Sequence, residues 1–229
     1  MRHKLIILAV TALSPLFFTA NAQTHYKAHI SAGAHAGMTM SEMAWSPSVR
    51  QSFVNGFTGG FSFRYAEERH VGILGEINIS QRGWKEDFEG APFSYSRKLT
   101  YIEMPIMTHI FFGSRTVKGF INLGPEIGVM IADNISADFN YKNPSSIPDF
   151  PIANRSVLQM GMDIKNKFDY GITAGAGVEF VIARRHSIML EGRYYYGLGN
   201  IFASSKKDPF SASRGTSILI TLGYMFRIK

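Results

Sequence analysis

The chain has 229 residues, a formal net charge of +7 and no cysteine. This length fits one domain, and an all-β barrel of this size need not be divided further. Without cysteine, disulfides and thiolate metal sites are excluded. The basic residues are scattered along the chain rather than gathered in one run, so we expect no nucleic-acid partner.

The first 22 residues have the features of a secretory signal peptide. Arg2 and Lys4 precede the apolar run 5–13, and Ala20-Asn21-Ala22 has the form of a cleavage site. The run is shorter than the roughly 18 apolar residues that a spanning helix needs, and no other stretch approaches that length. We therefore expect residues 1–22 to be a signal peptide and residues 23–229 to form one exported domain.

Eight segments of the exported part alternate between apolar and polar residues. Successive side chains of a strand point to opposite faces, so this period of two predicts strands. The clearest example is 101–131, where two amphipathic arms flank the turn Gly113-Ser114-Arg115-Thr116. In chain order the predicted strands are 26–37, 56–66, 71–83, 99–112, 119–132, 168–183, 187–199 and 215–228.

The predicted connections alternate in length. Those after the second, fourth and sixth strands are short, whereas those after the first, third, fifth and seventh are long, the longest being 133–167. An even strand count with short turns at one end and long loops at the other is typical of bacterial outer-membrane barrels.

One face of each predicted strand is aliphatic or aromatic, and the other carries glycine, glutamate and arginine. In a soluble lipocalin-like barrel the polar face would lie outside, where lysine is common, but no lysine lies in mid-strand here. Turning these charges toward lipid would cost roughly 2–4 kcal/mol for an arginine at the midplane. The sequence therefore predicts an all-β, eight-stranded antiparallel up-and-down transmembrane β-barrel, OmpA/OmpX-like, with a closed polar interior, in the outer membrane of a Gram-negative bacterium.

The interior of an eight-stranded barrel is just wide enough to be filled by side chains. We therefore expect the inward charges to pair as a closed plug rather than to line a channel. Because removal of one partner leaves a buried unpaired charge, Glu103→Leu and Glu126→Leu are each expected to destabilise the barrel without opening a pore. The predicted barrel-interior polar network consists of Arg64, Glu76, Arg82, Glu103, Glu126, Glu179, Glu191, Arg193 and Arg227.

Three strand motifs resemble a known family. Tyr101-Ile102-Glu103-Met104-Pro105, Leu123-Gly124-Pro125 and Gly56-Phe57-Thr58-Gly59-Gly60 are similar to motifs of the PorT-like outer-membrane β-barrel family of Bacteroidota. The resemblance covers about residues 26–229, and its motif residues are Tyr101, Glu103, Pro105, Gly124 and Pro125. It implies an eight-stranded outer-membrane barrel. The founding member of that family is associated with type IX protein secretion, although most relatives are not tied to it.

Histidines and loop acids offer little catalytic or metal-binding potential. His25, His29 and His35 share one face of the first strand, but two residues along a strand span about 6–7 Å, so His29 and His35 are too far apart for one ion. We expect the inward histidines, with His109, to bond to the glutamate network. The long loops hold aspartates but no histidine, because His70 and His186 fall in the short turns. We expect no enzyme activity, no metal and no cofactor, and we assign Gly175-Ala-Gly177 to barrel packing.

The long loops are more apolar than free surface loops need be. Two explanations compete: the loops pack on one another as a lid, or they dock a partner. Near the long-loop end we expect some of six aromatic residues to belong to an interfacial aromatic belt: Trp84, Phe88, Phe93, Tyr95, Phe139 and Tyr141. The candidate partner-loop residues are Phe139, Tyr141, Phe150 and Met160.

Three function classes follow. The leading hypothesis is a non-enzymatic scaffold or docking protein, embedded in outer-membrane lipid, with an envelope or secretion-system protein as partner through its long loops. The second is a passive structural or surface-binding barrel of the OmpX-like type. The third is a lipid-modifying or proteolytic barrel enzyme.

Overall fold

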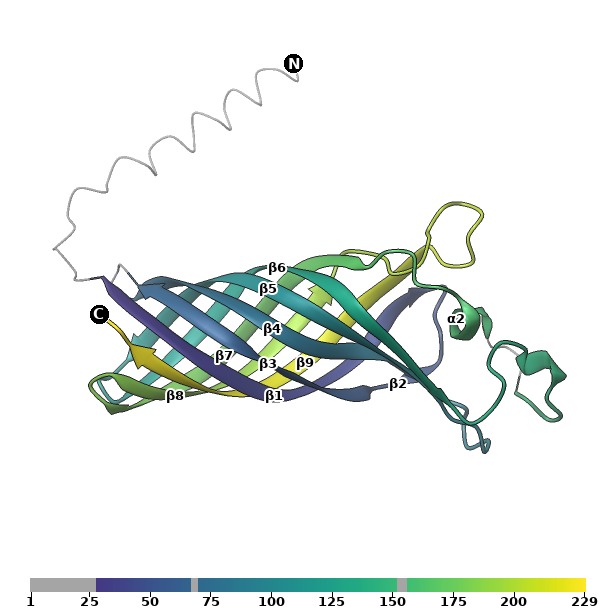
Figure 1. Ribbon diagram of the computed structural model, residues 1–229, viewed down its shortest axis with the longest axis horizontal. Helices are drawn as coiled ribbons and strands as arrows, with labels where there is room; N and C mark the ends of the chain where they lie inside the picture. Colours follow the sequence, from purple (N-terminus) through teal and green to yellow (C-terminus); the bar gives the residue numbers. More distant parts are fainter. Residues whose placement is uncertain (1–27, 67–69, 152–155) are drawn as a thin grey trace, which may run out of the picture.

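The computed structural model describes residues 28–66, 70–151 and 156–229. The predicted signal peptide and His25 lie outside these residues. Nearly all the regular structure is antiparallel β-strand, wound into one elongated cylinder (Figure 1). Among the described residues, no helix has the length and apolar character needed to cross a membrane.

The strands pair in chain order and close into a ring. Each strand is antiparallel to its neighbours, β1 pairs with β9, and the pairing of β4 with β5 completes the circle. The short β2 and the longer β3 both pair with β4, on the side away from β5. Together they occupy a single strand position in the ring. The predicted eight-stranded barrel is thus confirmed. The strands are β1 (His29–Ser46), β2 (Gln51–Ser52), β3 (Val54–Ala66), β4 (Val71–Glu86), β5 (Tyr95–Gly113), β6 (Val117–Ala137), β7 (Phe168–Ala183), β8 (His186–Gly197) and β9 (Ala212–Arg227), with η2 (Pro144–Ser146) and α2 (Leu158–Gly161) between β6 and β7.

The two faces of the wall are oriented as the alternation predicts. Large apolar side chains point outward around the ring, among them Phe61 at 74% exposure and Ile121 at 48%. Glu126 and Glu179 point inward and are only 5% and 2% exposed. A soluble barrel would have the opposite arrangement, so the lipocalin-like alternative is excluded. The outer face is an apolar band suited to lipid.

The interior has three tiers along the barrel axis. At the end that holds the long loops (the long-loop end), Trp84, Tyr95, Phe202 and neighbouring residues form a large buried cluster, which we term the lid cluster. At the end that holds the chain's C-terminus (the short-turn end), Phe120, Met189 and Met225 form a small one. Buried charged residues fill the middle tier.

The first strand is longer than predicted. It continues past Gly37 to Ser46, pairing with β9 as far as Ser46↔Ala212. The prediction failed because the alternation reverses there: Glu42 lies on the outer face, and apolar Met43 and Trp45 lie on the inner face. Thr39 and Ser41 anchor the extension from inside, since Thr39 donates its hydroxyl proton to the carbonyl oxygen of Gln81 (2.6 Å) and Ser41 accepts from the backbone N–H of Gly83 (2.9 Å). The following connection, 47–50, is consequently short, so only three of the four predicted long loops are present: 87–94, 138–167 and 198–211.

Two glycines of β7 explain why this strand can lie against bulky inward side chains. A Cβ added at Gly175 would lie 2.4 Å from the Glu191 Oε1 atom, and one added at Gly177 would lie 2.4 Å from the Phe120 Cζ atom. Any side chain at either position would collide with the interior filling. These glycines therefore serve barrel packing.

Candidate functional site

Arg193 is the centre of the interior network. From β8 its guanidinium reaches across the lumen to Glu76 on β4, with both nitrogens hydrogen-bonded to the carboxylate (2.7 and 3.0 Å). The same group also bonds to Glu191 two residues earlier (2.8 Å). Two-point bonds of this kind are the stronger class of charged hydrogen bond. Arg193 thus ties together two strands that pairing alone does not connect.

A second ion pair lies nearer the short-turn end. Arg64 on β3 bonds through two nitrogens to Glu179 on β7 (2.9 and 2.8 Å), and Ser187 donates its hydroxyl proton to the same carboxylate (2.6 Å). His109 begins the connection between this ion pair and that of Arg193. Its Nδ1 lies 2.7 Å from the Asn122 Oδ1 atom.

The link continues through the Asn122 amide, which donates to Glu191 Oε1 (2.8 Å). With the amide oxygen facing the ring, His109 Nδ1 must be the donor and Nε2 the acceptor, 3.3 Å from Arg64 Nη1. The histidine is therefore assigned as neutral. It belongs to the interior network, as the sequence analysis expected.

Arg82 forms the third centre, toward the long-loop end. Its guanidinium lies between two aromatic rings, 4.4 Å from the centroid of Tyr101 and 4.2 Å from that of Tyr195. It pairs with Glu103 (2.8 Å) and with Asp169 (3.3 Å). The sequence analysis missed Asp169 and Tyr195, although the alternation of side chains places both on the inner faces of β7 and β8.

Glu126 is the member of the predicted network that stands apart. It is buried, yet it forms no ion pair or hydrogen bond with any described residue. Among the described residues of the middle tier, three guanidiniums (Arg64, Arg82 and Arg193) face six carboxyl groups (Glu76, Glu103, Glu126, Asp169, Glu179 and Glu191). Carboxyl groups thus outnumber cations inside the barrel. Burial of an isolated carboxylate is costly, so Glu126 is the group least able to remain charged.

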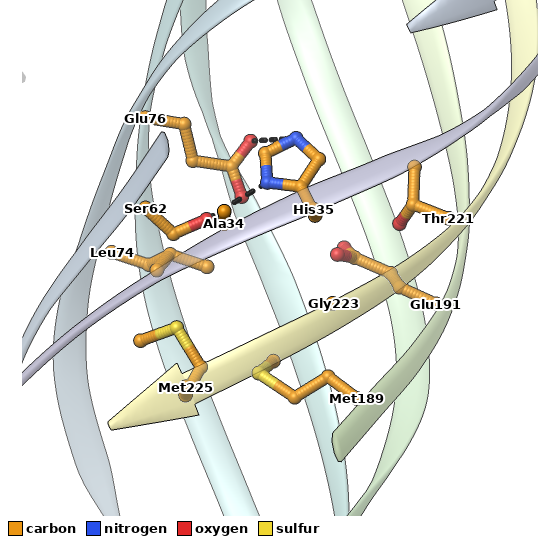
Figure 2. Close-up of a pocket in the computed structure, with 10 residues that line it drawn as sticks. All are labelled: Ala34, His35, Ser62, Leu74, Glu76, Met189, Glu191, Thr221, Gly223 and Met225. Atoms are coloured by element: carbon orange, nitrogen blue, oxygen red, sulfur yellow. Dashed lines mark hydrogen bonds and ion pairs between the residues drawn. The ribbon is translucent and has the colours of Figure 1, made fainter. Parts of the chain in front are cut away.

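The lumen around this network is nearly filled. Figure 2 shows the space beside His35, whose Nδ1 lies 2.9 Å from the Ser62 hydroxyl and whose Nε2 lies 3.8 Å from Glu76. The cavity there measures about 20 Å³. That volume suffices for about one water molecule. The interior at this level is a plug and not a channel.

Arg227 differs from the other predicted network residues. It is half-buried at the short-turn end of β9, where it lines a wide cavity with Lys118 and Arg184. The other eight predicted residues are buried on the inner face. The difference arises because alternation along a strand determines which face a residue lies on, but not how far along the barrel axis it lies. Arg227 lies at the end of its strand and is therefore less buried than the others.

The motif residues lie side by side on β5 and β6. Tyr101, Glu103 and Pro105 face inward. Pro125 faces outward, and a Cβ on Gly124 would lie 2.0 Å from the carbonyl oxygen of Ile106. The β5–β6 pairing skips two residues on each strand at this point, resuming at Thr108↔Leu123. Proline has no N–H to donate, so the motif interrupts the ladder locally.

The apolar loop residues do not form an exposed docking surface. Phe150 and Met160 are buried in the lid cluster, and Phe139 and Tyr141 pack against it. Of the two explanations for the apolar loops, these contacts favour a lid over the mouth of the barrel, and partner binding by these four residues stays a prediction. Trp84, Phe88, Phe93 and Tyr95 likewise pack in or on this cluster. All six aromatic residues considered for an interfacial belt therefore belong to the lid instead.

Tyr95 fastens the loop 138–167 to the barrel wall. Its hydroxyl donates to the carbonyl oxygen of Met160 (2.8 Å), and the side chain is fully buried. We expect Tyr95→Phe to weaken loop closure by about 1 kcal/mol, the usual worth of one such bond. The measurement is the rate of tryptic cleavage within 138–167, which should rise several-fold. Tyr194→Phe, on the lipid face, is the matched control, and equal rates in both variants would contradict the assignment.

No metal-binding cluster is assembled in the part of the chain described. Within 28–66, 70–151 and 156–229 no three His, Cys, Asp or Glu side chains are arranged to hold a metal ion. His70 and His186 lie at the short-turn end, opposite the aspartates of the long loops.

A free strand edge is the second candidate site. β7 pairs with β6 only as far as Val129, whereas β6 continues to Ala137 with β5 as its partner. In the described parts of the chain, no backbone hydrogen bond reaches residues 131–137 from the side away from β5. We call this segment the β6 edge. Figure 1 shows the β5–β6 ribbon projecting beyond the rest of the ring.

Beside the β6 edge lies a gap of about 360 Å³. Its far wall is the returning segment that includes Asp163, Ile164 and Lys167. That segment is itself bonded elsewhere, because the backbone N–H groups of Lys165 and Asn166 both reach the carbonyl oxygen of Ile201. The β6 edge is therefore not covered by its own loop.

Comparison with known proteins decides the family. The family model described as outer membrane protein beta-barrel domain matches residues 15–203. The chain belongs to this family. The protein is thus a small β-barrel of the Gram-negative outer membrane, which confirms the predicted localisation. No curated protein matches the chain.

Solved structures similar to this barrel include three bacterial proteins of low sequence identity. They are OprG from Pseudomonas aeruginosa (9% identity, TM-score 0.49, covering 88% of this chain and 95% of that one), the Neisserial surface protein A, NspA (13%, 0.45, 88% and 99%), and Ail, the attachment invasion locus protein of Yersinia pestis, in complex with the heparin analogue sucrose octasulfate (12%, 0.41, 86% and 99%).

Proposed function

We propose that this barrel is a non-enzymatic docking protein of the outer membrane, whose partner adds a strand to the β6 edge. The supporting observation is the unpaired edge itself. Its seven residues span roughly 20 Å, which is the length of an ordinary strand. An exposed row of backbone N–H and C=O groups is a template for pairing with another chain. The apolar loop residues then serve as a lid that holds the ribbon in place.

Site-specific cross-linking in intact cells tests this proposal. Because the chain has no cysteine, Asn134→Cys gives a unique attachment point on the β6 edge for a photoreactive maleimide. We expect one cross-linked band of defined mass.

A matched pair of second substitutions identifies the edge as the cause. Ser96 and Ser136 face each other across the β5–β6 ladder, but only Ser136 lies on the free edge. Lysine on an edge strand discourages strand addition. Ser136→Lys should therefore abolish the band, and Ser96→Lys should leave it. A band that survives both substitutions, or no band in the parent, would refute docking at this edge.

The resemblance of 101–105 and 123–125 to PorT-like barrels supports a component of the type IX secretion machinery as the partner. Deletion of the gene should then block secretion of cargo. A copy carrying Ser136→Lys should fail to restore secretion, while the Ser96→Lys copy restores it. Normal secretion in the deletion strain would exclude this role. Docking at the β6 edge would then be judged from the cross-linking result alone.

A passive surface-binding barrel is the second candidate, and the same projecting ribbon favours it. Such a barrel would attach cells to surfaces without a stoichiometric envelope partner. Attachment that depends on Ser136, combined with no cross-linked band, would favour this second candidate.

A further inference from the structure

The short-turn end of the barrel opens into a cavity walled by cations. It measures about 660 Å³, within the usual size range of small-molecule sites. Four lysine and arginine side chains line it, Arg115, Lys118, Arg184 and Arg227, together with His29 and His70. They come from four places in the chain: the β5–β6 turn, the start of β6, the β7–β8 turn and the end of β9.

These four cations are not held in ion pairs with described residues, and no described carboxylate lines the cavity. Glu179 lines the small space below together with Lys118 and Arg227, and its carboxylate is bonded to Arg64 and Ser187. That ion pair closes the floor, so the cavity is a blind vestibule.

Like charges around a shared hollow repel one another and concentrate anions within it. A cleft lined by one sign of charge, with low-dielectric walls, focuses its field inward. Arginine binds phosphate by paired hydrogen bonds, and lysine adds a point charge. Four convergent cations suit a group with several negative charges better than a single carboxylate.

We propose that this vestibule is a binding site for a phosphate-bearing ligand that enters from the periplasm. The short turns of outer-membrane barrels face the periplasm, which gives the direction of entry. Two sources share this chemistry: a soluble phosphorylated compound and the head group of an inner-leaflet phospholipid.

The test uses the full barrel domain in nanodiscs of phosphatidylcholine, titrated with inorganic pyrophosphate and followed by calorimetry. Arg184 and Arg185 provide a matched pair, since they are adjacent exposed residues of one turn and only Arg184 lines the cavity. We expect pyrophosphate to bind the parent. Arg184→Gln and Lys118→Gln should each weaken binding at least tenfold, and Arg185→Gln should change it less than twofold.

A second arm distinguishes the source. Nanodiscs containing phosphatidic acid report lipid binding through enrichment of the acid around the barrel. Enrichment that is lost in Arg184→Gln and kept in Arg185→Gln supports the site with a lipid as ligand, even where pyrophosphate fails.

Three results would overturn the proposal. They are no binding in either arm, equal loss in Arg184→Gln and Arg185→Gln, and binding of a tetra-aspartate peptide where neither phosphate probe binds. Heat-modified migration of each variant on a gel verifies folding, so a null result cannot be assigned to a misfolded barrel.

Discussion

Arg193→Leu is expected to destabilise the barrel by about 3–5 kcal/mol, the usual cost of removing one partner of a buried ion pair. Its guanidinium is the only group in the described middle tier that bonds to both Glu76 and Glu191. Without it these two carboxylates would face each other in a lumen with almost no space for water. The urea midpoint of unfolding in detergent micelles should fall, and the fraction of heat-modifiable barrel should decrease.

The same substitution should not create a pore. Leucine occupies part of the space that the guanidinium leaves, and the Arg64 and Arg82 centres remain as barriers. We therefore expect single-channel conductance in planar bilayers to remain at the baseline of the parent.

Two control variants separate the ion pair from a general loss of charge. Arg185→Leu, in an exposed turn, should change stability by less than about 0.5 kcal/mol. The triple variant Arg193→Leu, Glu76→Gln, Glu191→Gln removes the unpaired charges and should recover most of the loss. If the triple variant were no more stable than Arg193→Leu alone, unpaired charge would not be the cause.

The alternation of side chains was sufficient to predict the ring of strands and which residues face inward. This works because lipid and lumen impose opposite preferences on neighbouring positions of every strand. The start of β7 at Phe168 and its end at Ala183 were predicted to the residue. The signal failed on β1, where Glu42 lies on the outer face and Met43 and Trp45 lie on the inner face, which reverses the alternation.

Which charges pair with which could not be predicted in this way. Arg193 and Glu76 are 117 residues apart and meet across the lumen only because of the stagger of the whole ring. Alternation defines a face, whereas stagger depends on every strand pairing together. The isolation of Glu126 was hidden for the same reason, since from the sequence it is one inward glutamate among five.

The lid could not be predicted from the sequence for a different reason. Phe139, Phe150 and Met160 lie in segments without a period, so the sequence shows that they are apolar but not what they cover. The structure brings Trp45 from the extension of β1 and Phe202 from the last loop to the same place, with their rings stacked 5.6 Å apart. Contacts between irregular segments far apart in the chain leave no local pattern.

Glu103→Leu and Glu126→Leu are expected to differ sharply, although the sequence analysis predicted that both destabilise the barrel. The two glutamates lie on adjacent strands and both face the lumen, so the same chemical change is made in nearly the same surroundings. Glu103 neutralises Arg82 at 2.8 Å. Its loss should cost about 3 kcal/mol, the lower end of the range for a broken buried pair, because Asp169 still contacts the same guanidinium.

Glu126→Leu should instead be neutral or stabilising by up to about 2 kcal/mol. It removes a carboxyl group that no described cation contacts, and it lowers the excess of acids over guanidiniums in the middle tier. Urea unfolding of both variants beside the parent makes the comparison, and neither should conduct ions. If Glu126→Leu proved as costly as Glu103→Leu, Glu126 would have to hold a stabilising partner, and the interior would be electrostatically balanced rather than acidic.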